Sequence, residues 1–179
     1  VLDPGDHSPA GSVADEQLRA DYLDFDALRK MASRCAAATT EFENVPADSL
    51  DFLAQHGIVS PSARAVSIAQ DRVREKTFLA EHGLDVAPFA VIASEADIAD
   101  ARITPLLPGI LKIARLGYDG KGQVRVATTD DVRAAFASLG SKTCVLEKFL
   151  ALECEVSVVV ARGFDDEVVT FPVAENQHA

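Results

Sequence analysis

The chain has 179 residues, 48% hydrophobic and 25% charged, a composition that can bury the core of an ordinary globular domain. Its 17 Lys and Arg against 28 Asp and Glu give a formal net charge of −11, with no run of basic residues. Such a surface repels nucleic acid and anionic membranes, and no stretch approaches the roughly 20 apolar residues that cross a bilayer. Nucleic-acid binding and membrane insertion are therefore not expected.

The cysteines and the N-terminal segment favour a cytoplasmic protein. Cys35, Cys144 and Cys154 are an odd number without Cys-x-x-Cys spacing. They are predicted to be reduced, small buried side chains rather than disulfide partners or zinc ligands. Residues 1–12 lack the basic and apolar regions of a secretion signal.

The first part of the chain alternates between stretches that favour helix and stretches that favour strand. The pattern predicts a loop over residues 1–11, a helix over 26–36, a strand over 38–43, a helix over 49–55 and a helical stretch over 62–82. The last stretch is expected to break near Asp71 and to stop at Gly83, since glycine commonly ends a helix. This alternation is typical of a parallel α/β sheet.

The second part is richer in strands. The pattern predicts strands over residues 89–93, 109–114, 123–127, 143–149, 153–161 and 168–173, with a helix over 128–139. Ser94 and Asp97 have the spacing of a capping box, with Asp in place of the usual Glu. They predict a short helix between the first two of these strands.

A glycine-rich loop, Gly-Tyr-Asp-Gly-Lys-Gly-Gln, spans residues 117–123. Gly117, Gly120 and Gly122 lack the Cβ atoms that would keep the backbone from an anion, and Lys121 adds a positive charge. Predicted strands flank the loop on both sides, whereas Walker A and Rossmann loops open a helix. A phosphate-binding loop and a plain β-hairpin both fit this pattern.

Lys112 lies within an apolar strand, where alternation places it on one face with Ile110 and Ala114. An ammonium group there is costly unless it is paired or reaches water. A nucleotide phosphate beside the glycine-rich loop would satisfy it. The alternative is an edge-strand lysine that extends its amine to solvent.

Three other polar groups lie near strand ends. Glu147 and Glu155 are candidates for the adenine and ribose positions of a nucleotide site, or else solvated charges. His178 closes a polar cluster where ligands often meet a sheet, and it is either an anion contact or an exposed loop histidine. No Gly-x-Ser-x-Gly segment supports a serine hydrolase.

Motifs over almost the whole chain carry a resemblance to a known family. They occupy residues 42–46, 61–62, 69–72, 108–112, 117–123, 146–149, 155–163 and 171–178, in that order. Together they resemble the ATP-grasp superfamily and, within it, the 5-(carboxyamino)imidazole ribonucleotide synthases. The glycine-rich loop with Ala-Glu-Asn-Gln-His at 174–178 is specific to these enzymes. A lysine strand with a glycine-rich loop would indicate only ATP-grasp.

The resemblance implies an α/β ATP-grasp fold, present in part. It places the rest of an N-terminal parallel α/β (pre-ATP-grasp) domain at residues 1–76, the small ATP-grasp lobe at 77–150 and the start of the larger lobe at 151–179. The implied reaction belongs to purine biosynthesis. ATP phosphorylates bicarbonate to carboxyphosphate, and the amino group of 5-aminoimidazole ribonucleotide takes up the carboxyl group, with release of ADP and phosphate.

The resemblance also implies roles for residues, in enzymes that clamp ATP between two lobes. The ATP contacts would be Arg72, Lys112, Gly117, Tyr118, Asp119, Gly120, Lys121, Gly122, Gln123, Glu147, Lys148, Phe149, Leu150, Glu155 and His178. Lys112 and His178 would be the catalytic residues. The ribonucleotide contacts would be Glu43, Tyr118 and Lys121. Positive groups around a transferred phosphoryl group lower its barrier by positioning and charge stabilisation.

Both ends depart from the family pattern. The initial strand and Gly-Gly-Gly-Gln-Leu-Gly turn of the family are missing, and its Mg²⁺ ligands are expected beyond Ala179. We therefore expect a fragment with no metal ligands of its own and no ligase activity. Its parent would be a cytoplasmic enzyme, usually a homodimer, that acts on ATP, bicarbonate and 5-aminoimidazole ribonucleotide.

Two other functions stay open at this point. One is a different ATP-grasp ligase, such as a formate-dependent glycinamide ribonucleotide transformylase or a biotin-carboxylase-like enzyme. The other is a nucleotide-binding or dimerisation module without catalysis. The acceptor that stimulates ATP hydrolysis separates the ligases, and ATP titration tests for a nucleotide site.

Overall fold

The structure is a computed structural model that describes residues 1–117 and 122–177. It divides into two compact units, Val1–Lys148 and Phe149–Ala179, and each is described by itself. None of the helices in these described ranges is long and apolar enough to span a membrane.

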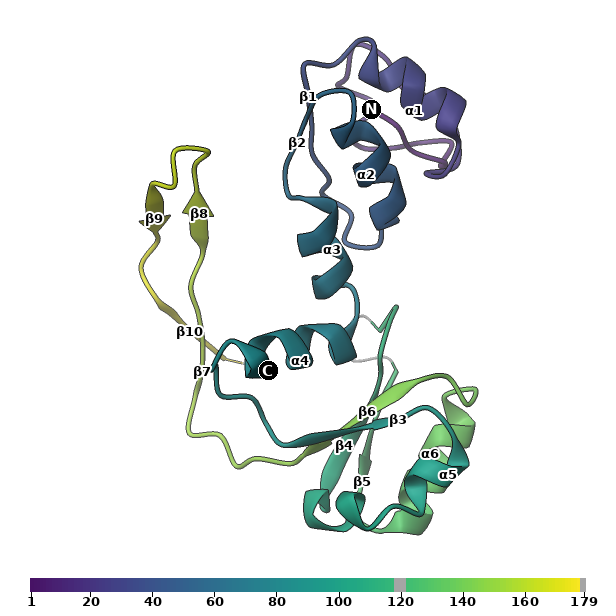
Figure 1. The fold of residues 1–179 in the computed structure, drawn as a ribbon, viewed down its shortest axis with the longest axis vertical. Coiled ribbons are helices and arrows are strands. Elements are labelled where there is room, and N and C mark those ends of the chain that lie inside the picture. The colour runs from purple at the N-terminus through teal and green to yellow at the C-terminus, as the bar shows by residue number, and fades with distance from the viewer. Residues whose placement is uncertain (118–121, 178–179) are drawn as a thin grey trace. The chain divides into compact units, whose positions relative to one another are not determined.

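The N-terminal part of the first unit combines two helices with a small parallel sheet (Figure 1). Its elements are α1 (Phe25–Ala32), β1 (Ala37–Ala38), α2 (Ala47–Ala54) and β2 (Ile58–Val59). β1 and β2 pair in parallel, and Leu28, Leu50 and Leu53 of the two helices are buried. The predicted parallel α/β arrangement is confirmed, although each strand has two residues.

The strand predicted over residues 38–43 is wrong beyond its first residue. After Ala38 the chain turns, and the Thr40 hydroxyl donates a hydrogen bond to the Phe42 carbonyl at 2.9 Å. Short polar side chains offer the backbone such local hydrogen bonds in place of a strand partner. β2, which the pattern did not predict, follows Gly57 directly.

Two consecutive helices, α3 (Ala63–Ala69) and α4 (Arg72–Glu81), follow β2. The Asp71 carboxylate accepts hydrogen bonds from the backbone N–H groups of Val73 at 3.0 Å and Arg74 at 3.3 Å. These bonds satisfy N–H groups that have no partner within the helix, so a new helix begins there. The predicted break near Asp71 is therefore confirmed, and Gly83 ends α4 with a φ of 76°.

A four-stranded antiparallel sheet forms the rest of the first unit (Figure 1). Its strands are β3 (Phe89–Ile92), β4 (Gly109–Ile113), β5 (Gln123–Val126) and β6 (Cys144–Lys148), in the order β3-β6-β4-β5. The helices α5 (Glu95–Ile98), η1 (Ala101–Leu106) and α6 (Thr129–Ser138) contribute Ile98, Ile103, Val132 and Phe136 to the core beneath it. Among the elements formed by residues 89–117 and 122–148, η1 alone was not predicted.

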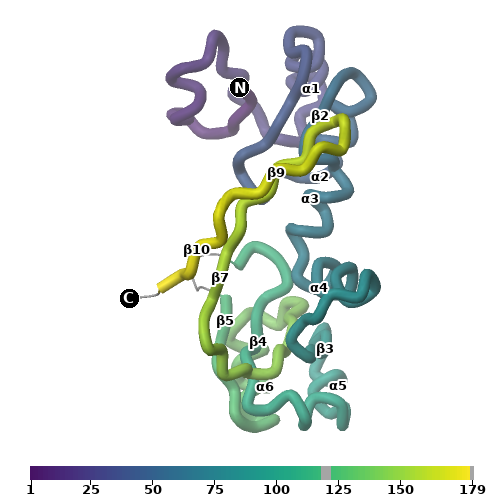
Figure 2. Tube along the Cα trace, turned by 90° about the vertical axis from the view of Figure 1, so that its left-hand side faces the viewer, coloured from purple at the N-terminus to yellow at the C-terminus, as the bar shows by residue number. Residues whose placement is uncertain are grey.

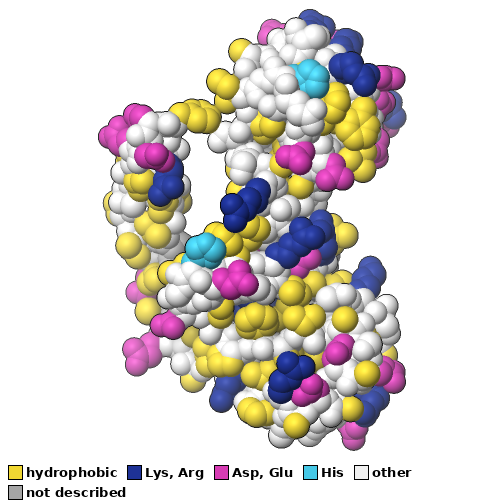
Figure 3. Space-filling view, viewed as in Figure 1, with side chains coloured by type: hydrophobic (Ala, Val, Ile, Leu, Met, Phe, Trp, Pro, Cys, Tyr) yellow, Lys and Arg dark blue, Asp and Glu magenta, His cyan; other side chains and the backbone are white. Residues whose placement is uncertain are grey.

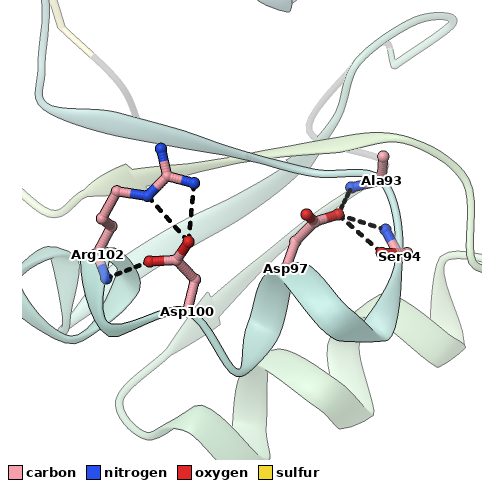
Figure 4. Close-up of polar contacts among 5 residues, drawn as sticks. All are labelled: Ala93, Ser94, Asp97, Asp100 and Arg102. Atoms are coloured by element: carbon pink, nitrogen blue, oxygen red, sulfur yellow. Dashed lines mark hydrogen bonds and ion pairs between the residues drawn. The ribbon is translucent and has the colours of Figure 1, made fainter.

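The short helix α5 begins with the predicted capping box (Figure 4). The Asp97 carboxylate accepts hydrogen bonds from the Ser94 hydroxyl at 3.0 Å and from the backbone N–H groups of Ser94 and Ala93 at 2.8 and 3.0 Å. These bonds, led by that from the Ser94 hydroxyl, lower the pKa of Asp97. In the same way, the Arg102 guanidinium lowers the pKa of Asp100 at the start of η1.

The second unit consists of two antiparallel ladders that follow one another along a hairpin (Figure 2). β7 (Glu155–Ser157) pairs with β10 (Ala174–Asn176), and β8 (Val160–Arg162) pairs with β9 (Val168–Thr170). The single strand predicted over 153–161 is therefore two strands, the one predicted over 168–173 ends at Thr170, and β10 was not predicted. Hydrophobic side chains lie exposed on this unit (Figure 3). Phe164 is the most exposed of the large hydrophobic residues that it contributes.

The cysteine prediction is confirmed in part. All three cysteines are free, and Cys144 is fully buried in β6. Cys35 and Cys154 are exposed, so their prediction as buried side chains is wrong. Burial raises the pKa of the Cys144 thiol to about 11.

Candidate functional site

The predicted glycine-rich loop joins two neighbouring antiparallel strands, β4 and β5. Lys112 lies opposite Gln123, and the Ile113 N–H donates to the Gly122 carbonyl at 2.8 Å. Gly122 has a φ of 78°, and a Cβ there would come within 2.7 Å of the Ile113 side chain. Glycine is thus required at this end of the loop. Residues 118–121 lie outside the described residues, so the predicted roles of Tyr118, Asp119, Gly120 and Lys121 stay predictions.

Lys112 occupies an interior strand of the sheet. β4 lies between β6 and β5, so the alternative of an edge-strand lysine is wrong. The Lys112 side chain is 22% exposed, and its Nζ lies 3.1 Å from Glu147 Oε2. Glu147 is buried, which also excludes the alternative of a solvated strand-end charge.

The strand register explains how these two residues meet. Ile110 lies opposite Glu147 and Lys112 lies opposite Val145, so Lys112 and Glu147 are diagonal neighbours on one face. Phe89 of β3 lies opposite Glu147 on its other side and shares that face. The intervening Leu111 and Leu146 point to the opposite face, into the core.

A second lysine reaches this face from α4. Lys76 Nζ lies 3.5 Å from Glu147 Oε2 and 5.5 Å from the centre of the Phe89 ring. No role was predicted for Lys76 from the sequence. The sequence did indicate that Lys76 lies near Arg72, because Lys76 is four residues after Arg72 and residues at this spacing share a helix face.

A separate cavity gathers predicted contacts of the nucleotide and the ribonucleotide. Glu43, Arg72 and Gly117 line a cavity of about 370 Å³ within the first unit. The Arg72 N–H donates to the Ala114 carbonyl at 2.9 Å, which fixes the start of α4 against the end of β4. Leu116, which also lines the cavity, has a φ of 62°, a strained conformation for a branched side chain.

Gln70 connects two walls of this cavity. Its side-chain amide donates to the carbonyls of Glu43 at 2.7 Å and Val45 at 2.6 Å. The Arg115 guanidinium donates to the Gln70 amide oxygen at 3.5 Å. Gln70 therefore holds the turn that carries Glu43, a role that the sequence analysis did not assign.

The other predicted contacts are spread over both units. Lys148 is exposed at the end of β6, and its N–H donates to the Pro88 carbonyl at 2.9 Å. Phe149, Leu150 and Glu155 belong to the second unit, where Glu155 Oε1 accepts a hydrogen bond from Asn176 at 3.0 Å. His178 lies outside the described residues, so its predicted role stays a prediction.

Metal binding finds no support in residues 1–117 and 122–177. They contain no group of three or more His, Cys, Asp or Glu side chains placed to hold a metal ion. These residues do not fit a Mg²⁺ site, and no step proposed below passes through a metal.

Family comparisons agree with this architecture. An ATP-grasp domain model matches residues 77–179, and a ribonucleotide synthetase preATP-grasp domain model matches residues 1–70. The chain belongs to the ATP-grasp family, as the resemblance predicted.

Within that family, the chain is similar to N5-carboxyaminoimidazole ribonucleotide synthases. The one from Brucella melitensis is 43% identical over 180 residues, which cover 99% of this chain and 50% of that protein. The crystal structure of the Staphylococcus aureus synthetase complexed with ADP matches with a TM-score of 0.91 at 37% identity, over 99% of this chain and 48% of the other.

A third relative carries both a nucleotide and a ribonucleotide. The Aspergillus clavatus synthase in complex with ADP and 5-aminoimidazole ribonucleotide matches with a TM-score of 0.83 at 27% identity, over 99% of this chain and 46% of the other. The chain thus spans about half the length of the relatives that it matches.

Proposed function

We propose that this chain supplies the preATP-grasp domain and the glycine-loop lobe of a ligase that carboxylates 5-aminoimidazole ribonucleotide. ATP and bicarbonate would be the co-substrates, and N5-carboxyaminoimidazole ribonucleotide, ADP and phosphate the products. The relatives support this proposal by their names and bound molecules, ADP in one and ADP with the ribonucleotide in another.

The contact between Lys112 and Glu147 carries the proposal. An ammonium group on an interior strand next to the glycine-rich loop is held by one buried carboxylate, which also lies near a second lysine. Partly desolvated positive charge favours a multiply charged anion, since Coulomb interactions strengthen as the effective dielectric falls. A nucleotide phosphate fits this requirement.

The family resemblance suggests roles for the remaining residues. Arg72 and Lys112 would contact phosphates, with residues 117–123 over the triphosphate. Residues 147–150 would frame the adenine and Glu155 the ribose, with His178 near the nucleotide or the bicarbonate. Glu43, Tyr118 and Lys121 would contact the ribonucleotide, and the cavity beside Glu43 and Arg72 supports that assignment.

The proposed reaction has two steps in which these residues would take part. Attack of bicarbonate oxygen on the γ-phosphorus breaks the bond to ADP and forms carboxyphosphate. The ribonucleotide amine then attacks the carboxyl carbon, loses a proton and releases phosphate. Lys112 would stabilise the charge that develops on the transferred phosphoryl group, and the Glu43 cavity would hold the amine close to the carboxyphosphate.

Three further features belong to the proposal. Mg²⁺ is the metal expected for the full enzyme, where it would neutralise phosphate charge, and its ligands would come from outside the residues that the structure describes. A homodimer and a cytoplasmic location are expected of that enzyme, and the free cysteines are consistent with a reducing compartment.

Calorimetric titration of ATP into this chain tests the nucleotide site. The unmodified chain should bind ATP, and Lys112→Ala should weaken binding by roughly tenfold or more, because a cation at the phosphates is lost. Lys142→Ala, which removes an exposed lysine, serves as the matched control. Undiminished binding by Lys112→Ala would refute the role of that lysine.

A second measurement tests the acceptor. In a protein of the relatives' length, ADP production should require both bicarbonate and 5-aminoimidazole ribonucleotide. Stimulation by glycinamide ribonucleotide with formate, or by biotin, would favour another ATP-grasp ligase. Robust activity of the 179-residue chain by itself would contradict the expectation that it is inactive alone.

A further inference from the structure

Lys76, Glu147 and Lys112 form a cluster with more positive than negative charge. Two ammonium groups lie 3.5 and 3.1 Å from the same carboxylate oxygen, Glu147 Oε2. The three side chains are 14%, 11% and 22% exposed, in the order Lys76, Glu147, Lys112. Within the part of the chain that the structure describes, neither lysine forms an ion pair with a second carboxylate.

The charge balance decides what Lys112 can do. A pair of Lys112 with Glu147 alone would be neutral, and the carboxylate would repel an approaching phosphate about as strongly as the ammonium attracts it. Adding Lys76 gives the cluster one net positive charge. Like charges in a poorly solvated site are unfavourable, so the cluster is stabilised when an anion binds.

Phe89 fixes Lys76 in place. The Lys76 ammonium lies 5.5 Å from the centre of the Phe89 ring, within the range of a cation–π contact. The Phe89 position is set by the sheet, because its residue lies opposite Glu147 in the β3–β6 ladder. Lys76 is therefore held between a ring and a carboxylate, on the face that carries Lys112.

We infer that Lys76 is a positioning residue for nucleotide binding. It offsets the charge of Glu147, so that Lys112 keeps its positive charge available for the phosphates of ATP. This role of Lys76 rests on the proposed function, but it predicts a separate effect on nucleotide binding. The benefit of Lys76 should grow with the number of phosphate groups on the ligand, because it acts through charge.

Titration of ATP, ADP and AMP into the purified chain tests the inference. Lys76→Met should weaken ATP binding on the order of tenfold and AMP binding much less, so that the preference for ATP over AMP shrinks. Lys76→Arg keeps the charge and the aromatic contact, and should restore most of that preference. Arg74→Met, which removes an exposed cation from the same helix, should leave it unchanged.

The outcomes separate this inference from the function on which it rests. An ATP-to-AMP preference that is equal in the unmodified protein and in Lys76→Met would overturn the role of Lys76. Equal weakening for all three nucleotides would also overturn it, because a structural defect does not distinguish phosphate number. No nucleotide binding by the unmodified protein, with an intact fold by circular dichroism, would instead reject the proposed nucleotide site, and the role of Lys76 with it.

Discussion

The two faces of the four-stranded sheet are built from alternate residues of the same strands, yet their chemistry is opposite. One face carries Leu111, Cys144 and Leu146, all at 0% exposure, and packs against α5, η1 and α6. The other carries Lys112 and Glu147, with Lys76 of α4 completing an ion cluster. Burial of the apolar face stabilises the fold, and the charged face carries the candidate nucleotide site.

The buried apolar face determines which side chains lie on the charged face. Side chains alternate along a strand, so a slip of one residue would send Lys112 into the core and Leu111 out of it. Burial of Leu111 and Leu146 excludes that slip and thereby fixes the diagonal contact of Lys112 with Glu147. Damage to the apolar face should therefore cost folding stability, whereas changes on the charged face should affect anion binding as well.

The largest expected effect is on the apolar face. Leu146→Ala should lower the free energy of unfolding by about 3–5 kcal/mol, because it leaves a cavity in a fully buried core. Chemical denaturation followed by circular dichroism measures this loss. Val91→Ala on the exposed part of the other face should cost about 1 kcal/mol or less. Equal losses for the two variants would contradict the assignment of the faces.

The charged face should respond according to which ion is removed. Glu147→Gln leaves two poorly solvated ammonium groups without a counter-charge and should lower the free energy of unfolding by about 2–4 kcal/mol. Lys76→Met leaves a neutral pair and keeps an apolar side chain beside Phe89, so its loss should be about 1 kcal/mol or less. The same denaturation assay at pH 7 compares them. A larger loss for Lys76→Met would mean that the cluster does not carry excess positive charge.

Much of this fold was predictable because its strongest signals are local. The helix break near Asp71 and the capping box of Ser94 and Asp97 were predicted from nearby residues, and the structure confirms both. The apolar strand containing Lys112 was also predicted to within one residue, since it was expected over 109–114 and spans Gly109–Ile113. The short strands of the second unit were not predicted correctly. Hydrophobic periodicity does not show at which residue a valine-rich stretch stops pairing with its neighbouring strand.

The candidate site was predictable only in its separate residues. The sequence indicated Lys112 and Glu147 independently, but their contact depends on the register between strands 35 residues apart. Lys76 lies on α4 and Gln70 caps the end of α3, both within the predicted helical stretch, and nothing in that pattern shows which strand or turn they reach. Tertiary contacts of this kind follow from the packing of the elements, which the sequence alone did not define.

Cys144 offers a smaller test of the apolar face. At pH 8 its thiolate fraction should be roughly hundredfold below that of an ordinary thiol, because burial raises its pKa from 9.0 to about 11. Exposed Cys35 and Cys154 should react with a thiol reagent in the native protein, and Cys144 only after unfolding. Mass spectrometry of the labelled peptides measures this order. Rapid native labelling of Cys144 would show that this face opens.

The same thiol makes stability depend on alkaline pH. A folded pKa above the unfolded value means that the thiol's contribution is complete below about pH 9 and declines as the pH rises toward 11. Cys144→Ala should remove that part of the decline, as judged by Tm measured at several pH values. An unchanged decline in the variant would assign it to other groups.

The smallest expected effect concerns Asp131, which caps α6 beneath the apolar face. Its carboxylate accepts hydrogen bonds from the backbone N–H groups of Ala127 at 3.1 Å and Thr128 at 2.9 Å, and these bonds lower its pKa. The contribution of a carboxylate with a lowered pKa is present above its ordinary value of 3.8 and is lost as the pH falls through the folded pKa. Asp131→Asn should therefore lower Tm slightly at pH 7, and the difference from the unmodified protein should shrink in strong acid. Asp130→Asn changes a residue in the same helical turn but outside the cap, and it should lower Tm less. An equal or larger decrease in Tm would show that first-turn charge matters more than the cap.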